Sequence, residues 1–221
     1  GASYVGFHYQ LPYGLQIVIA VAFAILLAGV WGGIAGVLKA KTGAHEVIVT
    51  IMLNYIAARF ILWILRQTAF LRPGRIDPIA PPIKESAHLP LLLGDQFRVN
   101  FGIIIALSFA GLVYLLLNRT TLGFRFRAVG ANSTAAKTAG IAVGATTISA
   151  MVLSGALAGL GGAIHVLGNQ YELTTDIAGS FGFDAITVAL LGRGNPVGVV
   201  LAAILFAALR VGGVTMQANV Q

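Results

Sequence analysis

Two groups of residues have the types that could do hydrolytic chemistry, and each lacks a member of its pattern. His45 and Glu46 begin like a zinc-protease helix, but Val49 stands where the second metal-binding histidine must lie on the same helix face. Ser154 stands beside Gly155, but Val152 stands where a nucleophile elbow needs glycine. We therefore predict no catalytic residue and no metal site.

The sequence also lacks the motifs that bind nucleotides. The glycine-rich run 159–162 has no further glycine at position 164 and follows no predicted strand, so it does not fit a dinucleotide-binding turn. No Gly-Lys-Ser/Thr phosphate loop occurs, and the chain has no cysteine. We expect the chain not to be an enzyme and to bind no cofactor of its own.

Polar side chains inside long apolar runs are the remaining candidates, because such residues are costly in a membrane and are functional by default. Thr50, Asn54, Asp184 and Thr187 are the candidates for a solute path. Asn54 can hydrogen-bond a solute or a neighbouring helix. Asp184 starts a short apolar run, where capping a helix N-terminus is the first interpretation and solute contact the sharper one. We expect His165 to be a core or interfacial histidine.

The elements that must position these residues are membrane spans. The chain has 221 residues, of which 57% are hydrophobic and 10% charged, whereas a soluble domain has about 25% charged residues. A span needs about 20 apolar residues. We predict an all-α, polytopic membrane protein with five spans near 15–38, 47–65, 101–117, 143–168 and 197–214. The run 181–191 is too short to cross and is predicted to be a half-helix or re-entrant element.

Two hydrophilic segments separate these spans. The segment 66–100 holds five of the seven prolines and is predicted to be an extracytoplasmic loop. The segment 119–140 is basic, with four cations and no acid, and because cytoplasmic loops gather Lys and Arg we place it inside. The net charge of +7 is thus explained by topology in a lipid bilayer, and we expect no nucleic-acid partner.

A short helix is predicted within the basic segment. Asn132 is a good N-cap and Gly140 a good C-terminal stop for a helix over 133–139. Such a helix, rich in small residues, is suited to docking in a groove of another protein. The alternative, an ordinary basic juxtamembrane loop, stays open on these residues alone.

Several motifs, taken in order, resemble one family. The segment 119–141 is similar to the cytoplasmic loop of permease subunits in bacterial ABC importers, in the group that handles branched-chain amino acids, simple sugars and nucleosides. The other matching segments are Gly-Val-Leu-Lys-Ala-Lys at 36–41, His-Glu-Val-Ile-Val-Thr-Ile-Met-Leu-Asn-Tyr-Ile-Ala at 45–57, Ser-Gly-Ala-Leu-Ala-Gly-Leu at 154–160, Gly-Phe-Asp-Ala-Ile-Thr-Val-Ala-Leu-Leu-Gly at 182–192 and Asn195-Pro196. The segments 46–57 and 182–184 are most similar to the nucleoside branch.

The resemblance implies a transport role without chemistry in this chain. A permease of this family pairs with a second permease, identical or different, in the bacterial inner membrane. A substrate-binding lipoprotein or periplasmic protein delivers the solute, and two ATPase subunits hold ATP and magnesium. The short helix would contact the ATPase through Ala131, Asn132, Ala135, Ala136 and Gly140, with Arg125 and Arg127 as supporting cations.

The rival functions differ in class. Within the family, the solute could be a branched-chain amino acid or a simple sugar rather than a nucleoside. Outside it, an ion-coupled secondary transporter would carry buried acids paired with bases, and a purely structural membrane subunit would bind no solute. Members of the resembled family are longer, so we expect this chain to be a partial chain or a shortened homologue.

Overall fold

The computed structural model of the chain describes residues 2–8, 12, 14–43, 45–67, 70–72, 77–92, 99–175, 177, 179 and 181–220. Part of the predicted loop 66–100 therefore lies outside the described residues, as does Asp176 in the loop before the predicted half-helix. The helices are α1 (Ala2–His8), α2 (Leu15–Thr42), α3 (Glu46–Leu65), the short 3-10 helix η1 (Glu85–Ala87), α4 (Gly102–Arg119), α5 (Thr121–Ala131), α6 (Ser133–Thr138), α7 (Val143–His165), the π-helical turn η2 (Val166–Gln170), α8 (Phe181–Leu191) and α9 (Pro196–Val220).

Five helices in the described part are long and apolar enough to cross a membrane, which confirms the predicted all-α polytopic class. They cover 15–42, 47–65, 102–119, 196–217 and the continuous stretch 143–170 formed by α7 and η2. Each contains or nearly contains one of the ranges read from the sequence. The 11-residue helix α8 lies where the short element was expected. Length and hydropathy locate these helices because each span must satisfy its backbone internally while exposing apolar side chains to lipid.

Helices α2 and α7 form the closest pair in the structure, and glycines make that proximity possible. A Cβ added to Gly32 would lie 2.6 Å from the carbonyl oxygen of Met151, and one added to Gly159 would lie 2.5 Å from that of Ala24. Gly36 approaches the Cα of Ile148 in the same way. Small residues at such spacing allow backbones to pack closely in lipid, where no hydrophobic force drives helices together. Both spans are rich in glycine along the facing stretches.

A small buried core caps one end of this pair. It joins α1, the start of α2, the segment 83–89 and η2 through buried apolar side chains, namely Ala2, Val5, Ala20, Ile83, Ala87, Leu89, Ala163, Val166 and Leu167. The fully buried Gln16 side chain donates to the Val5 carbonyl (3.2 Å) and accepts from the Ser86 hydroxyl (2.7 Å). The described part of the proline-rich segment is therefore an integral part of the fold, which its extended character in the sequence did not indicate.

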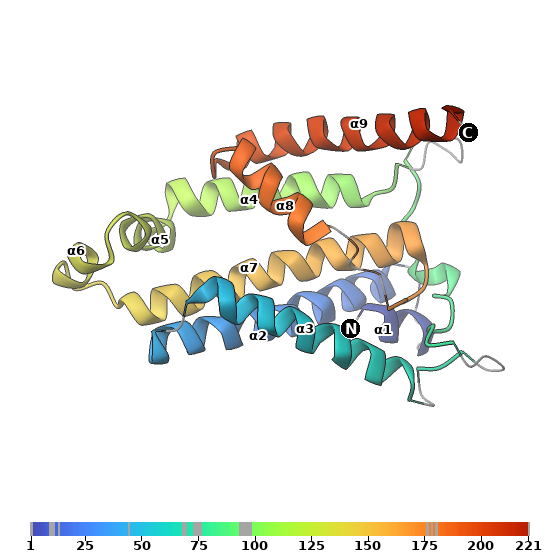
Figure 1. Cartoon of the computed structure of the whole chain (residues 1–221), viewed down its shortest axis with the longest axis horizontal. Helices are drawn as coiled ribbons and strands as arrows, with labels where there is room; N and C mark the ends of the chain where they lie inside the picture. The colour runs from blue at the N-terminus through green and yellow to red at the C-terminus, as the bar shows by residue number, and fades with distance from the viewer. Residues whose placement is uncertain are drawn as a thin grey trace.

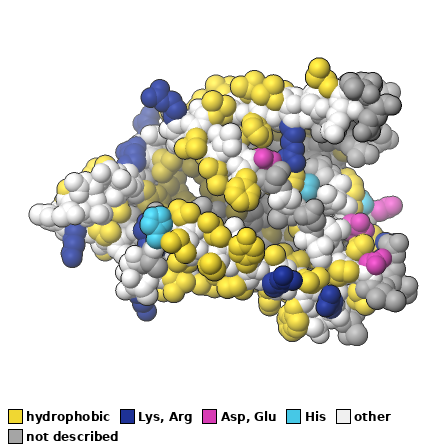
Figure 2. Space-filling model, viewed as in Figure 1, with side chains coloured by type: hydrophobic (Ala, Val, Ile, Leu, Met, Phe, Trp, Pro, Cys, Tyr) yellow, Lys and Arg dark blue, Asp and Glu magenta, His cyan; other side chains and the backbone are white. Residues whose placement is uncertain are grey.

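A second layer consists of α4, α8 and α9, and it stands apart from the α2–α7 pair along much of its length (Figure 1). The helix α9 packs along α4, and α8 packs on α9. Figure 2 shows a hollow between the two layers, bordered by hydrophobic side chains. The helix α3 lies beside α2, with Trp31 and Phe60 stacked at 6.4 Å between ring centroids, and most of its side chains are exposed.

The ends of the helices fall into two groups. The C-terminal ends of α2 and α4, the N-terminal end of α7, and the helices α5 and α6 lie at one end of the molecule, while the cap lies at the other (Figure 1). The first group carries the six cations of the predicted cytoplasmic side, Lys39, Lys41, Arg119, Arg125, Arg127 and Lys137. The acids Asp77, Glu85 and Glu172 belong to segments at the cap end. The cap end also carries the described cations Arg66, Arg72 and Lys84, so the orientation rests on the basic segment 119–140, which has four cations and no acid.

Candidate functional site

The basic segment after α4 folds into two helices, α5 and α6, and an elbow joins α4 to α5. Thr120 makes the elbow: its hydroxyl accepts from the Gly123 amide (3.1 Å) and donates to the Leu116 carbonyl (2.6 Å). A Cβ at position 123 would collide with the Leu116 carbonyl, so glycine is required by this close approach. The Arg127 guanidinium donates to the Asn118 side-chain oxygen at 3.1 Å and ties α5 back to α4.

The short helix predicted from the sequence is α6, and both of its predicted caps are present. The Asn132 side chain accepts from the Ala135 amide at 3.0 Å, as an N-cap does. Gly140 adopts a left-handed conformation with φ of 80°. The Gly140 amide donates to the Lys137 carbonyl and the Ile141 amide to the Ala136 carbonyl, each at 3.0 Å, which together form a Schellman motif. The helix is thus fixed at both ends by its own sequence.

The residues proposed for partner contact differ in exposure. Arg125, Arg127, Ala131, Asn132, Ala135 and Gly140 are exposed, whereas the Ala136 side chain is buried, with 4% exposure. Ala136 therefore faces this chain and holds α6 in place.

The outward face of α6 follows from the burial of Ala136. Thr134 and Thr138 lie two positions before and after it, each about 160° around the helix axis from Ala136, and both are exposed. Reasoning from the sequence missed these two threonines. Only the burial of Ala136, which is a tertiary feature, distinguishes their face from the others.

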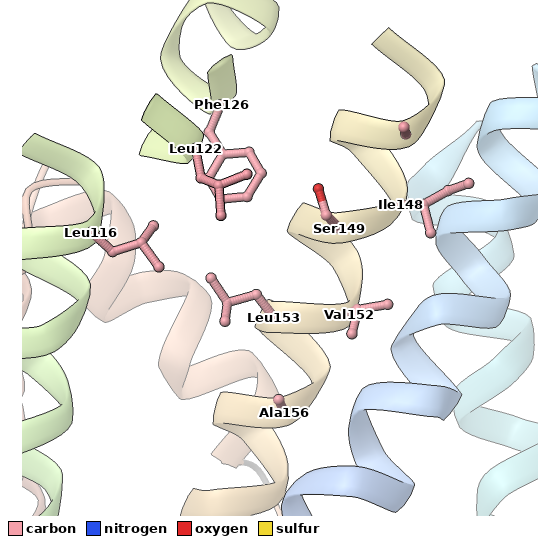
Figure 3. A pocket seen from close by; sticks show the side chains of 9 residues that line it. Leu116, Leu122, Phe126, Ile148, Ser149, Val152, Leu153 and Ala156 are labelled. Atoms are coloured by element: carbon pink, nitrogen blue, oxygen red, sulfur yellow. The ribbon is translucent and has the colours of Figure 1, made fainter. Parts of the chain in front are cut away.

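An apolar groove of about 570 Å³ lies beneath α5. Figure 3 shows Leu116 of α4, Phe126 of α5 and Leu153 of α7 pointing toward one another across it. Its single hydroxyl side chain, Ser149, donates to the Thr146 carbonyl (2.9 Å). Among the described residues, the lining of this groove therefore offers a polar solute no charged partner.

The four candidates for the solute path fall into two pairs on different helices. Thr50 and Asn54 lie one turn apart on α3, where the Thr50 hydroxyl donates to the Val47 carbonyl (3.0 Å) and Asn54 is exposed. Asp184 and Thr187 lie on α8, and the Thr187 hydroxyl donates to the Phe183 carbonyl (3.4 Å). Because α3 packs on α2 and α8 packs on α9, this chain does not gather the four residues into one site.

Asp184 has a role that the sequence did not predict. It lies in the first turn of α8, as the capping interpretation expects, but its Oδ2 accepts from Nη1 of Arg210 on α9 at 2.6 Å. The guanidinium also lies 4.9 Å from the centroid of the Phe181 ring, and the edge of that ring meets His165 of α7 at 4.9 Å. His165 is thus an interhelical contact residue, in agreement with its expected structural role.

Comparison with known proteins shows which family has this arrangement of spans, capped helix and polar pairs. A family model described as a permease component of branched-chain amino acid transport systems matches residues 1–220. The chain belongs to this permease family. The members of this family are permease components of transport systems, and the five apolar helices in the described part of the chain agree with a multi-pass protein of the cell membrane.

Individual relatives of this permease chain have different solutes in their names. The guanosine ABC transporter permease protein NupP of Bacillus subtilis is 40% identical over 220 residues, which cover 97% of this chain and 62% of the relative. The nucleoside permease NupB of Lactococcus lactis is 35% identical, over 92% of this chain and 58% of the relative. The glucose permease TsgB13 of Haloferax volcanii is 30% identical, over 97% and 59%.

The chain spans less than two thirds of the length of these three relatives. This fact agrees with the expectation from the sequence that family members are longer. No solved structure matches the chain.

Proposed function

We propose that this chain forms part of the permease subunit of an ATP-driven ABC importer that carries nucleosides across the bacterial cell membrane. The observation that carries the choice of solute is the 40% identity to a guanosine permease along 97% of the chain, against 30% to a glucose permease over the same share. A simple sugar or a branched-chain amino acid is the alternative solute within the family.

The helix α6 is the proposed contact with the ATPase subunit. Its caps fix the helix at both ends, and its exposed Ala135, Thr134 and Thr138 present small side chains that a groove in a partner can enclose. Asn132 and Gly140 preserve this shape through their caps. Ala131 lies on the exposed approach from α5, and Arg125 and Arg127 supply positive charge beside the contact.

Movement of α6 has a physical route into the membrane through α5. The Arg127–Asn118 hydrogen bond and the Thr120 elbow hold α5 to the end of α4, while Phe126 and Leu122 of α5 line the groove with residues of α7. A displacement of α5 therefore moves side chains that border both α4 and α7. Because packed side chains switch between discrete arrangements rather than deform continuously, a small shift at the ATPase can change the gap between the two layers.

The solute path is proposed to use Thr50 and Asn54 on α3 and Asp184 and Thr187 on α8. Hydroxyl, amide and carboxylate groups are the donors and acceptors that match the ribose hydroxyls and base edges of a nucleoside. A second permease subunit, identical or different, completes the path in this proposal. A substrate-binding lipoprotein delivers the solute, and ATP with magnesium belongs to the two ATPase subunits.

Uptake by cells tests this function. Bacteria that carry the complete operon, with or without this gene, are given labelled guanosine, leucine or glucose at equal concentrations. The proposal predicts that guanosine uptake alone depends on the gene and ceases when cellular ATP is depleted. Gene-dependent uptake of leucine or glucose instead would replace the solute. Uptake that survives ATP depletion but stops with an ionophore would replace the mechanism by ion coupling, for which the Asp184–Arg210 pair is the structural argument.

A further inference from the structure

A cluster of four side chains ties three helices together at the side of the hollow. Arg210 of α9 pairs with Asp184 of α8 at 2.6 Å and covers the ring of Phe181, whose edge contacts His165 of α7. These contacts lie in the first turn of α8 and hold it to both neighbours. Arg210 and Phe181 each make two of the three contacts, and Arg210 is the one that joins the carboxylate of Asp184 to the aromatic ring.

The position of Arg210 along α9 places the cluster within the depth of the membrane. Arg210 lies about 21 Å along the helix from Pro196 at about 1.5 Å per residue, and the hydrocarbon core is about 30 Å thick. In the orientation derived from charge, α9 begins at the inner side. The cluster therefore lies in the outer third of the core, where an arginine is far from the inner headgroups.

Arg210 and Asp184 are too exposed to lie against the hydrocarbon of the membrane. The side chains of Arg210 and Asp184 are 46% and 26% exposed. Charged groups at this depth face a bundle interior or a water-filled cavity, because hydrocarbon offers them no hydrogen-bond partners. In contrast, two neighbouring side chains of α8 are apolar and exposed, Phe183 at 78% and Ile186 at 57%. The two faces of α8 therefore have different environments.

We propose that Arg210 is a positioning residue of the solute path, which holds α8 so that Asp184 and Thr187 border an aqueous passage. The proposal rests on the proposed transport function and adds Arg210, supported by Phe181 and His165, to the residues that shape the path. Arginine suits this role because its planar guanidinium bonds the carboxylate and covers the aromatic ring at once. Lysine can satisfy the charge but not both contacts.

Site-directed thiol labelling tests the proposal in the intact transporter, assembled with its partner subunits in membrane vesicles. The chain has no cysteine, so Thr187→Cys and Ile186→Cys each introduce one thiol into this chain on adjacent positions with different faces. A membrane-impermeant cationic thiol reagent is then applied with and without saturating guanosine. We expect the Thr187→Cys thiol to react at least tenfold faster than the Ile186→Cys thiol, and guanosine to slow only the faster reaction.

Substitution of Arg210 provides the second arm. Arg210→Lys is expected to raise the KM for uptake at least fivefold and to remove the guanosine protection, while the subunits still copurify. Arg210→Gln removes the ion pair with Asp184 and is expected to lower uptake more than tenfold. A merely structural Arg210 would lower the amount of assembled complex without changing KM or protection.

Three results would overturn the proposal: equal labelling of both thiols, guanosine protection that persists in Arg210→Lys, or wild-type uptake by Arg210→Gln. The failure of the proposed function looks different. If the wild-type transporter moves a sugar or an amino acid rather than guanosine, the solute assignment fails, and the same labelling contrast with that solute still decides the role of Arg210.

Discussion

Gly32 of α2 and Gly155 of α7 face each other where the two helices pack closely, and a Cβ on Gly32 would lie 3.0 Å from the Cα of Gly155. The same Cβ would lie 2.6 Å from the Met151 carbonyl oxygen. Neither neighbour is a flexible side chain that can move aside. The pair therefore sets the distance between the two helices that form the centre of the fold.

Replacement of Gly32 by alanine is expected to destabilise the chain. The added methyl group must push the two backbones apart, and overpacking of this kind costs about 1–3 kcal/mol. Thermal unfolding of the purified protein in detergent or nanodiscs measures the effect as a lower midpoint.

Gly161→Ala is the matched control, because Gly161 lies on α7 with nothing within 4 Å of its added Cβ. Alanine there gains helix propensity and is expected to leave the midpoint unchanged or slightly higher. Equal losses at positions 32 and 161 would contradict the assignment of close packing to Gly32.

Asn100 is expected to fasten the start of α4 to the π-helical end of α7. Its amide donates to the Gly168 carbonyl (3.1 Å) and the Asn169 side chain (3.2 Å), and its oxygen accepts from the Gly102 amide (3.0 Å). Asn100→Leu leaves the Gly168 carbonyl and the Gly102 amide without these hydrogen bonds. Each of the two groups that no water reaches then costs about 1–3 kcal/mol of stability.

Hydrogen exchange measures this loss locally, as faster exchange of the amides around Gly102 and Tyr171. Asn100→Asp keeps the acceptor and loses the donor, so it should protect the Gly102 amide better than Asn100→Leu does. If both variants exchange at the wild-type rate, Asn100 is not the fastening residue.

The N-cap of α6 is expected to support coupling. Asn132→Ala removes the acceptor for the Ala135 amide and should weaken the short helix by about 1 kcal/mol, which lowers solute-stimulated ATPase activity of the assembled transporter. Asn132→Asp and Asn132→Ser restore a cap and should restore the activity. Failure of both to rescue would show that Asn132 acts by a direct contact rather than as a cap.

The two alanines of α6 should respond differently to arginine. Ala135 is exposed, so Ala135→Arg is expected to leave this chain folded and to block binding of the ATPase. Ala136 is buried, so Ala136→Arg should unfold α6 itself and accelerate proteolysis between α5 and α7. Copurification with the ATPase and limited proteolysis separate the two effects, and protease resistance in Ala136→Arg would contradict its structural role.

Local signals explain what the sequence predicted. The spans follow from the length of apolar runs, and the caps at Asn132 and Gly140 follow from residues within a few positions of the helix that they delimit.

Tertiary relationships account for what the sequence missed. The helix α5 carries glycines and cations rather than an apolar run, and Thr120 starts it by bonding two segments around the elbow. Asp184 and Arg210 are 26 residues apart on different helices, so only their packing shows that they are partners. The burial of Ala136 is likewise a property of the fold.

ATP-dependent guanosine uptake by the reconstituted transporter tests the central claim most directly. Vesicles enclose ATP and magnesium, the binding lipoprotein and labelled guanosine are outside, and the matched preparation carries Ala135→Arg in this chain. The account predicts guanosine accumulation that requires enclosed ATP and is lost in the variant. Guanosine accumulation without ATP, or equal accumulation with Ala135→Arg, would contradict it.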